Sequence, residues 1–216
     1  MNPFLHALLM QGTDSTPAPN NDMPTFSRRG FLHCAALGTL GAGAVFSGLS
    51  PVLAAEPRRA SSLILYFSRT GHTRSIAEHI HSRVGGDLIE LKTAVPYPAD
   101  YDVLVAQAQR EQKNNARPAL ATELPALDAY HTVFIGFPNW WSSMPMLFFT
   151  LWEKYTLGSK TLIPFCTHGG GRFGHSLQDL KRLCPQARIE KGFEVAGTRA
   201  ARAQNEVDAW LRTLDV

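Results

Sequence analysis

The chain is 216 residues long, 44% of them hydrophobic and 18% charged, and its formal net charge at pH 7 is +3. This length fits one domain, or two at most. Because the charge is small and spread along the chain, it favours neither nucleic acid nor an anionic membrane as a partner. The composition therefore excludes a strongly basic binding protein and leaves local motifs to indicate the function.

The first 55 residues have the features of an export signal rather than of a folded domain. Residues 1–22 are polar and irregular, without a period that could bury one face. Two adjacent arginines follow in the segment 27–32, and then an uncharged stretch rich in Gly and Ala at 31–51. A basic patch, an apolar middle and small residues before a cleavage point are typical of a secretory signal. The paired arginines indicate the twin-arginine type, with the twin-arginine export machinery as partner and cleavage near Ala54 or Ala55.

On this interpretation, residues 1–55 are a disordered leader with its signal, and residues 56–216 form one domain in the periplasm or otherwise exported. This domain keeps a net charge near +3, because the leader contains two arginines and two aspartates. A membrane anchor is the alternative, since about 20 apolar residues can span a bilayer. The glycines of the stretch favour a cleaved signal and no stable membrane span in the mature form. Met23 is an alternative start of translation.

From residue 62 onward, short apolar runs alternate with segments of helical periodicity. The runs are typical of strands that are covered on both faces of a sheet. The predicted strands are 62–67, 87–92, 132–137, 161–166 and 189–195. The predicted helices are 74–84, 101–112, 146–155, 176–183 and 205–214. Pro164 fits its strand only if this position makes no ladder hydrogen bond.

Five strands that alternate with five helices predict an α/β fold, a doubly wound five-stranded parallel sheet with helices on both faces. In such a sheet, ligands bind at the carboxyl ends of the strands, near the point where the strand order reverses. The chemistry is therefore expected in the loops that follow the strands, at 68–73, 138–145 and 167–175.

The first loop, 68–73, has the sequence S-R-T-G-H-T and lies between a buried strand and the start of a helix. Three hydroxyls, a glycine and the free N–H groups of the helix can together bind a phosphate. Arg69 and Arg74 could add charge, although solvated arginines and ordinary helix caps are the alternative. The Walker spacing and its lysine are absent, which favours a phosphate that is not part of a nucleoside triphosphate.

The second loop, 138–145, contains the adjacent Trp140 and Trp141. Two neighbouring tryptophans cannot easily point into one core, and large exposed aromatic side chains usually cover something. A flat aromatic ligand is one explanation. Contact with a partner surface, or packing of the loop on its own helix, is the other.

The third loop, 167–175, is rich in glycine and contains a G-x-G-x-x-G pattern. A dinucleotide site would have this pattern on the opening βα turn, with an acidic residue about 20 positions later. Here it follows the fourth strand, and Glu190 begins the next one, so the match is weak. The glycines instead allow backbone amides to approach the polar edge of a flat ligand. His168 could provide a proton or a charge at this edge of the ligand, and His175 is a weaker candidate for the same role. The alternative is that both histidines are simply solvated.

Cys166 and Cys184 are the thiols of residues 56–216. The predicted helix between them separates the two by about 15 Å, whereas a disulfide needs Cα atoms within about 7 Å. Two buried free thiols are therefore expected.

Taken together, the loops resemble those of the flavodoxin-like family, in particular its single-domain branch with S-R-T-G-x-T, P-x-W-W and P-F-C-T-H-G-G loops. They stand here at 68–73, 138–141 and 164–170, in the same order. The resemblance extends from about residue 62 to the carboxyl terminus. It implies a sheet of strand order 2-1-3-4-5 that holds FMN non-covalently, without a catalytic triad or a metal cluster.

The resemblance also implies which residues bind the cofactor. The phosphate would be held by Ser68, Thr70, Gly71, His72 and Thr73, with Arg69 in the same loop. The isoalloxazine ring would be lined by Pro138, Asn139, Trp140 and Trp141. Its pyrimidine edge would face Thr167, His168, Gly169 and Gly170. The family often has Asn at the position of His72, so the resemblance assigns no contact to this side chain.

Two functional classes are compatible with the resemblance. An electron carrier would dock on redox partner proteins, whereas an FMN-dependent NAD(P)H:quinone-type oxidoreductase would use a small electron donor or acceptor. The mild basicity is unlike the strongly acidic carriers of the family, but nicotinamide cofactors are scarce outside the cytoplasm and no nucleotide site is evident. We therefore expect FMN-dependent electron transfer outside the cytoplasm, with a partner of unknown identity. A binding module without flavin is a third class.

Overall fold

A parallel sheet forms the centre of the domain in the computed structural model, which describes residues 61–214. The predicted export signal and the boundary at residue 55 lie outside the described residues. The strands are β1 (Ser61–Tyr66), β2 (Asp87–Glu90), β3 (Tyr130–Pro138), β4 (Thr161–His168), β5 (Arg188–Ile189) and β6 (Phe193–Ala196). Their order is 2-1-3-4-5, and β6 also pairs with β4, so the predicted order and fold class are confirmed.

The helices lie close to their predicted ranges. They are α1 (His72–Val84), α2 (Tyr101–Lys113), α3 (Leu147–Lys154), α4 (Ser176–Leu183) and α5 (Gln204–Leu211). Two short 3₁₀ helices, η1 (Leu127–Ala129) and η2 (Gly197–Arg202), complete the set. None of the helices between residues 61 and 214 is long and apolar enough to cross a membrane.

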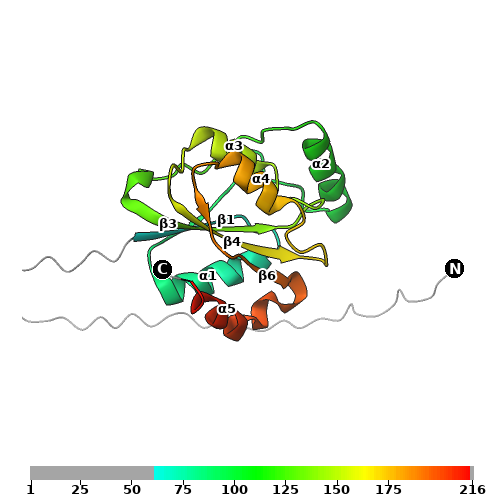
Figure 1. Cartoon of the computed structure of the whole chain (residues 1–216). Helices are drawn as coiled ribbons and strands as arrows, with labels where there is room; N and C mark the ends of the chain where they lie inside the picture. Colours follow the sequence, from blue (N-terminus) through cyan, green and yellow to red (C-terminus); the bar gives the residue numbers. More distant parts are fainter. Residues whose placement is uncertain (1–60, 215–216) are drawn as a thin grey trace, which may run out of the picture. The chain divides into compact units, whose positions relative to one another are not determined.

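Each face of the sheet has its own core, because successive side chains of a strand point to opposite faces. Val133 and Ile135 of β3 are buried on the face that α3 and α4 cover. Phe134, which lies between them, is buried on the face that α1 and α5 cover. Figure 1 shows the two helix pairs above and below the sheet. Burial on both faces explains why the apolar runs are uninterrupted. Each buried apolar side chain of this size stabilises the folded state by about 1.5–3 kcal/mol.

Helix α2 packs on neither face of the sheet. Its buried residues, Leu104 and Ala108, belong to neither of the two cores. Figure 1 shows α2 beyond α3 and α4, to the right of the sheet. Partly buried apolar side chains of the segments before and after α2, among them Tyr97, Leu120 and Leu124, pack on the core of the α3–α4 face instead.

The last strand differs from its prediction. The expected strand 189–195 is divided into β5 and β6, which pair with β4 on the same side. Leu162 pairs with Ile189 and Phe165 with Phe193, so three residues of the edge lie opposite two of β4. The Leu162 carbonyl accepts a hydrogen bond from the N–H of Glu190, and Pro164 faces the same edge two residues later. Pro164 has no N–H to donate, and its position coincides with the interruption between the β4–β5 and β4–β6 hydrogen bonds. This is the condition under which a proline fits in a strand.

Cys166 and Cys184, the cysteines of the described residues, are free and buried, as predicted. Burial raises the pKa of Cys184 to about 11, and it also raises the pKa of the Cys166 thiol. Both side chains therefore remain neutral and act as apolar parts of the core.

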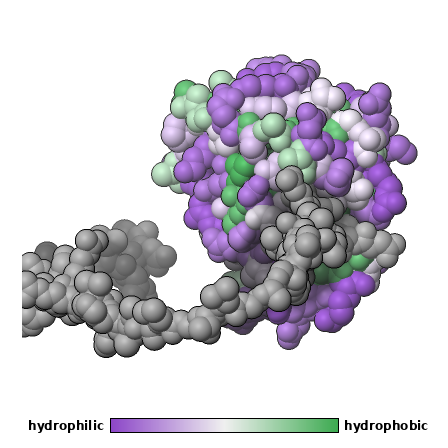
Figure 2. All heavy atoms as spheres, turned by 90° about the vertical axis from the view of Figure 1, so that its left-hand side faces the viewer, coloured by the Kyte–Doolittle hydropathy of each residue, from purple (hydrophilic) through white to green (hydrophobic). Residues whose placement is uncertain are grey.

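Large apolar side chains are exposed at few places in the domain. Figure 2 shows a face on which hydrophilic residues surround a narrow band of apolar ones. Apart from Leu177 on α4, the exposed large apolar side chains are Val95, Tyr101, Val103 and Trp141, which come from α2, the segment before it and the second loop. Most of the exposed large apolar side chains therefore belong to α2 or to segments next to it, on the side of the domain that Figure 2 does not show.

Candidate functional site

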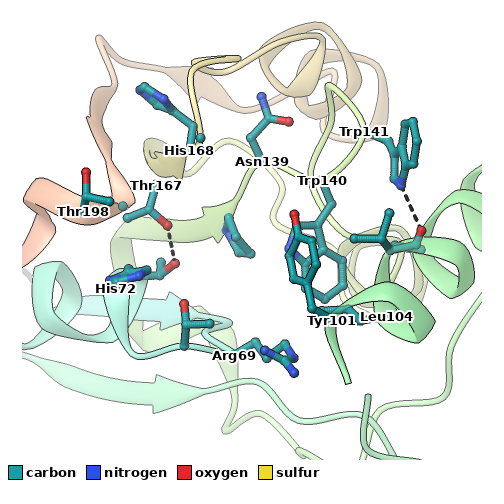
Figure 3. A pocket seen from close by; sticks show the side chains of 17 residues that line it. Arg69, His72, Tyr101, Leu104, Asn139, Trp140, Trp141, Thr167, His168 and Thr198 are labelled. Carbon is teal, nitrogen blue, oxygen red and sulfur yellow. Dashed lines mark hydrogen bonds between the residues drawn. The ribbon is translucent and has the colours of Figure 1, made fainter. Parts of the chain in front are cut away.

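A cavity of about 700 Å³ lies at the carboxyl ends of the strands, where the three predicted loops meet. Figure 3 shows the side chains that line it. All of the predicted cofactor-binding residues line this cavity except Ser68, Gly71 and Gly170. The sheet thus brings together side chains that are up to a hundred positions apart in the sequence.

The first loop offers unused hydrogen-bond donors at the start of α1. Gly71 has a left-handed backbone, with a φ of 84°, and no side chain caps the helix. The first N–H groups of α1 therefore have no intrahelical acceptor. Ser68 Oγ is buried and has no hydrogen-bond partner in the described part of the chain. Thr73 is not a cap either, because its Oγ1 lies 2.8 Å from Thr167 Oγ1 and links the first loop to β4.

The two arginines of this region are engaged away from the start of α1. Arg69 donates from Nε and Nη2 to the carbonyl oxygen of Pro98, 3.1 Å from each nitrogen, and also binds the Ala99 carbonyl. Arg74 pairs with Glu90 on β2. The structure therefore gives Arg69 a role that the sequence did not indicate, which is to connect the first loop to the segment that leads into α2.

The second loop is a tight turn in a strained conformation. Trp140 and Ser143 exchange backbone hydrogen bonds of 2.8 and 3.1 Å, and Trp141 and Ser142 have φ values of 50° and 63°. These are the features of a type I′ turn, which usually contains Gly or Asn, and each strained residue costs about 1–3 kcal/mol. The Ser142 carbonyl accepts a hydrogen bond of 2.6 Å from the N–H of His175, which holds the turn in place.

The turn sends the two tryptophans in different directions. Trp140 lines the cavity and packs edge-on against Phe67 and Tyr97, at centroid distances of 5.4 and 5.0 Å. Trp141 lies farther out, and its Nε1–H donates to the Val105 carbonyl of α2 over 3.0 Å. The Trp141 carbonyl in turn accepts a 3.0 Å hydrogen bond from Gln112. Both tryptophans therefore line the cavity, and Trp141 also fastens α2.

The aromatic cluster behind Trp140 is kept neutral and rigid. The Tyr97 hydroxyl donates to Glu111 of α2 over 2.8 Å. Burial raises the pKa of Tyr97, and the hydrogen bond to Glu111 adds to this effect. Tyr97 therefore carries no charge next to the cavity and supports Trp140 through ring contacts alone.

The third loop is connected to the second through Asn139. Asn139 Nδ2 donates to the Arg172 carbonyl over 2.6 Å, and its N–H donates to the Thr167 carbonyl over 2.8 Å. The Gly170 N–H donates to His168 Nδ1 over 3.0 Å, which places the hydrogen of a neutral His168 ring on Nε2. The Gly170 amide is thus used within the loop.

Two other parts of the wall were not predicted from the sequence. One is α2, with Tyr101, Leu104, Val105 and Ala108. The other is Gly197 and Thr198, which follow β6. The same rule that selected the first three loops applies to these two residues, because they come directly after the last strand.

The charges of the wall are unbalanced. Its ionisable side chains are those of Arg69, His72, Tyr101 and His168, and none of its described residues is Asp or Glu. In Figure 3, Thr167 and Thr198 lie with the two histidines on the left, whereas the two tryptophans and Leu104 lie on the right. The cavity therefore suits a ligand with an anionic group at one end and a flat, apolar part at the other.

Comparison with known proteins agrees with this geometry. Residues 61–214 match the model of a protein family described as flavodoxin. Crystal structures of flavoproteins from Bacteroides eggerthii and Bacteroides uniformis share 32% and 30% sequence identity, each with a TM-score of 0.64. They cover 72% and 71% of this chain and 98% of their own chains. A flavoprotein from Lactobacillus acidophilus, solved in complex with FMN, is 21% identical, with a TM-score of 0.55. The match covers 66% of this chain and 97% of that flavoprotein. No curated protein matches the chain.

We expect Arg69→Ala to loosen α2, because the change removes the hydrogen bonds to Pro98 and Ala99. Loss of these hydrogen bonds should lower the local stability of α2 by about 1.4 kcal/mol. Hydrogen exchange of the α2 amides, measured by mass spectrometry, should therefore become about tenfold faster. Arg74→Ala is the matched control. Because Arg74 pairs with Glu90 on β2, its removal should leave the exchange rates of α2 unchanged. Equal exchange of α2 in the wild type and in Arg69→Ala would show that Arg69 does not hold the helix.

Proposed function

The chain belongs to the flavodoxin family, and on this premise we propose that its cavity binds FMN non-covalently and that the protein transfers electrons through it. The observation that supports this proposal best is the cavity itself. It joins free N–H donors and hydroxyls at one end to a rigid aromatic wall at the other.

The residues at the start of α1 fit a phosphate group. Ser68 Oγ is a buried donor that finds no partner among residues 61–214, and a phosphate oxygen would satisfy it. The N–H groups of the first helical turn add donors and the positive end of the helix dipole. No described carboxylate lines the cavity to repel the anion. Ser68, Thr70, Gly71, His72 and Thr73 therefore remain the proposed phosphate site.

The second and third loops fit a flat aromatic ring. Trp140 is fixed by Phe67 and Tyr97, so it can stack on a ligand with little loss of side-chain entropy. Thr167, His168 and Gly169 bring polar groups to the neighbouring wall. When bound, FMN supplies the redox chemistry, and the protein orients it and adjusts its electrostatic surroundings.

We place this activity outside the cytoplasm, because the segment 27–32 with its two arginines is typical of a twin-arginine signal. That route carries folded proteins, and a non-covalent cofactor can be loaded before export. Replacement of Arg28 and Arg29 by lysine should keep the protein in the cytoplasm, as judged by cell fractionation. Unchanged export of this variant would contradict the twin-arginine assignment.

An FMN-dependent NAD(P)H:quinone-type oxidoreductase is the second candidate. The observation that favours it is the apolar wall of α2, which extends the cavity beyond the three loops expected to hold FMN. An electron carrier has no need of this additional wall, whereas a small substrate does.

A visible absorption spectrum of the purified protein mixed with FMN tests the proposal. Bound flavin should shift the absorption bands and quench flavin fluorescence. NADH and NADPH are then added without air. Bleaching of the bands by either would indicate a reductase, and bands that resist both would indicate a carrier. A protein that binds no FMN would refute the proposed function.

We expect His168→Ala to lower the reduction potential of bound FMN. His168 lines the cavity, and its Nε2–H is a donor that would favour negative charge on reduced flavin. The expected change is about 20 mV, which corresponds to about 1 kcal/mol for a two-electron couple. His175→Ala, a change in an exposed histidine outside the cavity wall, is the control. Equal potentials in all three proteins would exclude a role of His168 near the flavin.

A further inference from the structure

The imidazole of His72 lies at the end of the cavity where the first loop and η2 face each other. His72 is the first residue of α1, and both His72 and Thr198 line the cavity. A Cβ atom added to Gly197 would lie 3.1 Å from His72 Cδ2, so the ring rests against the backbone of Gly197. Figure 3 shows the His72 side chain near Thr167 and Thr198. The ring is therefore held at the phosphate end of the cavity without being buried.

The arginines that stand next to His72 and Thr198 in the sequence already have partners. Arg69 binds the carbonyls of Pro98 and Ala99. On α1, Arg74 pairs with Glu90, and on η2, Arg199 pairs with Glu206. These cations would have to break an existing interaction to reach a phosphate.

The other titratable group that faces this end is His168 on β4, and its Nδ1 is already bonded to the Gly170 N–H. His72 makes no side-chain hydrogen bond or ion pair in the described chain. It is thus the ionisable group of this end that is free to meet an anion.

We propose that His72 supplies the positive charge at the phosphate of FMN, so that FMN binds more tightly when the imidazole is protonated. This inference rests on the proposed function, because it needs FMN in the cavity. It assigns to the His72 side chain a role that an Asn at this position could not fill, since an amide does not ionise.

The direction of the pH effect follows from the charges. The phosphate monoester is anionic throughout the neutral range, so a protonated imidazole attracts it, whereas a neutral one offers a single hydrogen bond. FMN affinity due to His72 should therefore rise as the pH falls. The phosphate itself gains a proton near pH 6, which acts in the opposite direction. Comparison of the wild type with His72→Asn at each pH cancels this second effect.

The experiment measures the dissociation constants of FMN and riboflavin by flavin fluorescence between pH 6 and pH 8.5, with the full chain. The ratio of FMN affinities, wild type over His72→Asn, should increase about fivefold to tenfold from pH 8.5 to pH 6. Riboflavin, which lacks the phosphate, should give a constant ratio. Gly197→Ala is a second variant, because its methyl group would lie 3.1 Å from His72 Cδ2, closer than an ordinary contact, and by shifting the ring slightly should reduce the pH effect.

His175→Asn is the control and should keep the full pH effect, since His175 does not line the cavity. A ratio for FMN that stays constant with pH, while both flavins bind, would overturn the role of His72 and leave the proposed function intact. The same pH dependence for riboflavin would also overturn it, because the phosphate would not be involved. Binding of neither flavin would overturn both proposals.

Discussion

The hydrogen bond between the Ser142 carbonyl and the N–H of His175 anchors the turn at which the second loop, the third loop and α2 meet. It holds a turn whose two central residues have strained, left-handed backbones. A Cβ atom at Gly174 would lie 2.1 Å from the Ser142 oxygen, so the contact depends on a glycine at this position. Through the turn, Trp140 reaches the cavity and Trp141 reaches α2. The turn thus contacts both the third loop and α2.

The sheet and most helices could be predicted because burial on both faces leaves a clear signal in the sequence. The position of α2 could not. Leu104 and Ala108 repeat at helical spacing whether they face a sheet or a cavity, so the period shows a helix but not what it contacts. The split of the last strand was also invisible, since the extra residue shows only in the pairing with β4.

At the site, motif and spacing located the three loops, because the carboxyl ends of parallel strands meet at one edge. The individual side-chain contacts depend on tertiary structure. The sequence suggested a charge near a phosphate for Arg69, whereas the structure turns its guanidinium to the Pro98 carbonyl. Gly197 and Thr198 also follow the carboxyl end of a strand, so the same rule could have selected them. A glycine and a threonine after a short strand form no recognisable motif, however. Long polar side chains are thus the least predictable part of the site.

The interruption between β5 and β6 has a consequence for how the protein behaves when it is concentrated. These strands form one edge of the sheet, and a long continuous edge offers a template on which another chain can pair. Here the edge is broken after two residues, and the Lys191 carbonyl at the break accepts a hydrogen bond from Trp210 of α5 over 2.9 Å. Another copy would find only short and offset segments to pair with. The extra residue that accommodates Pro164 inside the sheet therefore also works against intermolecular aggregation.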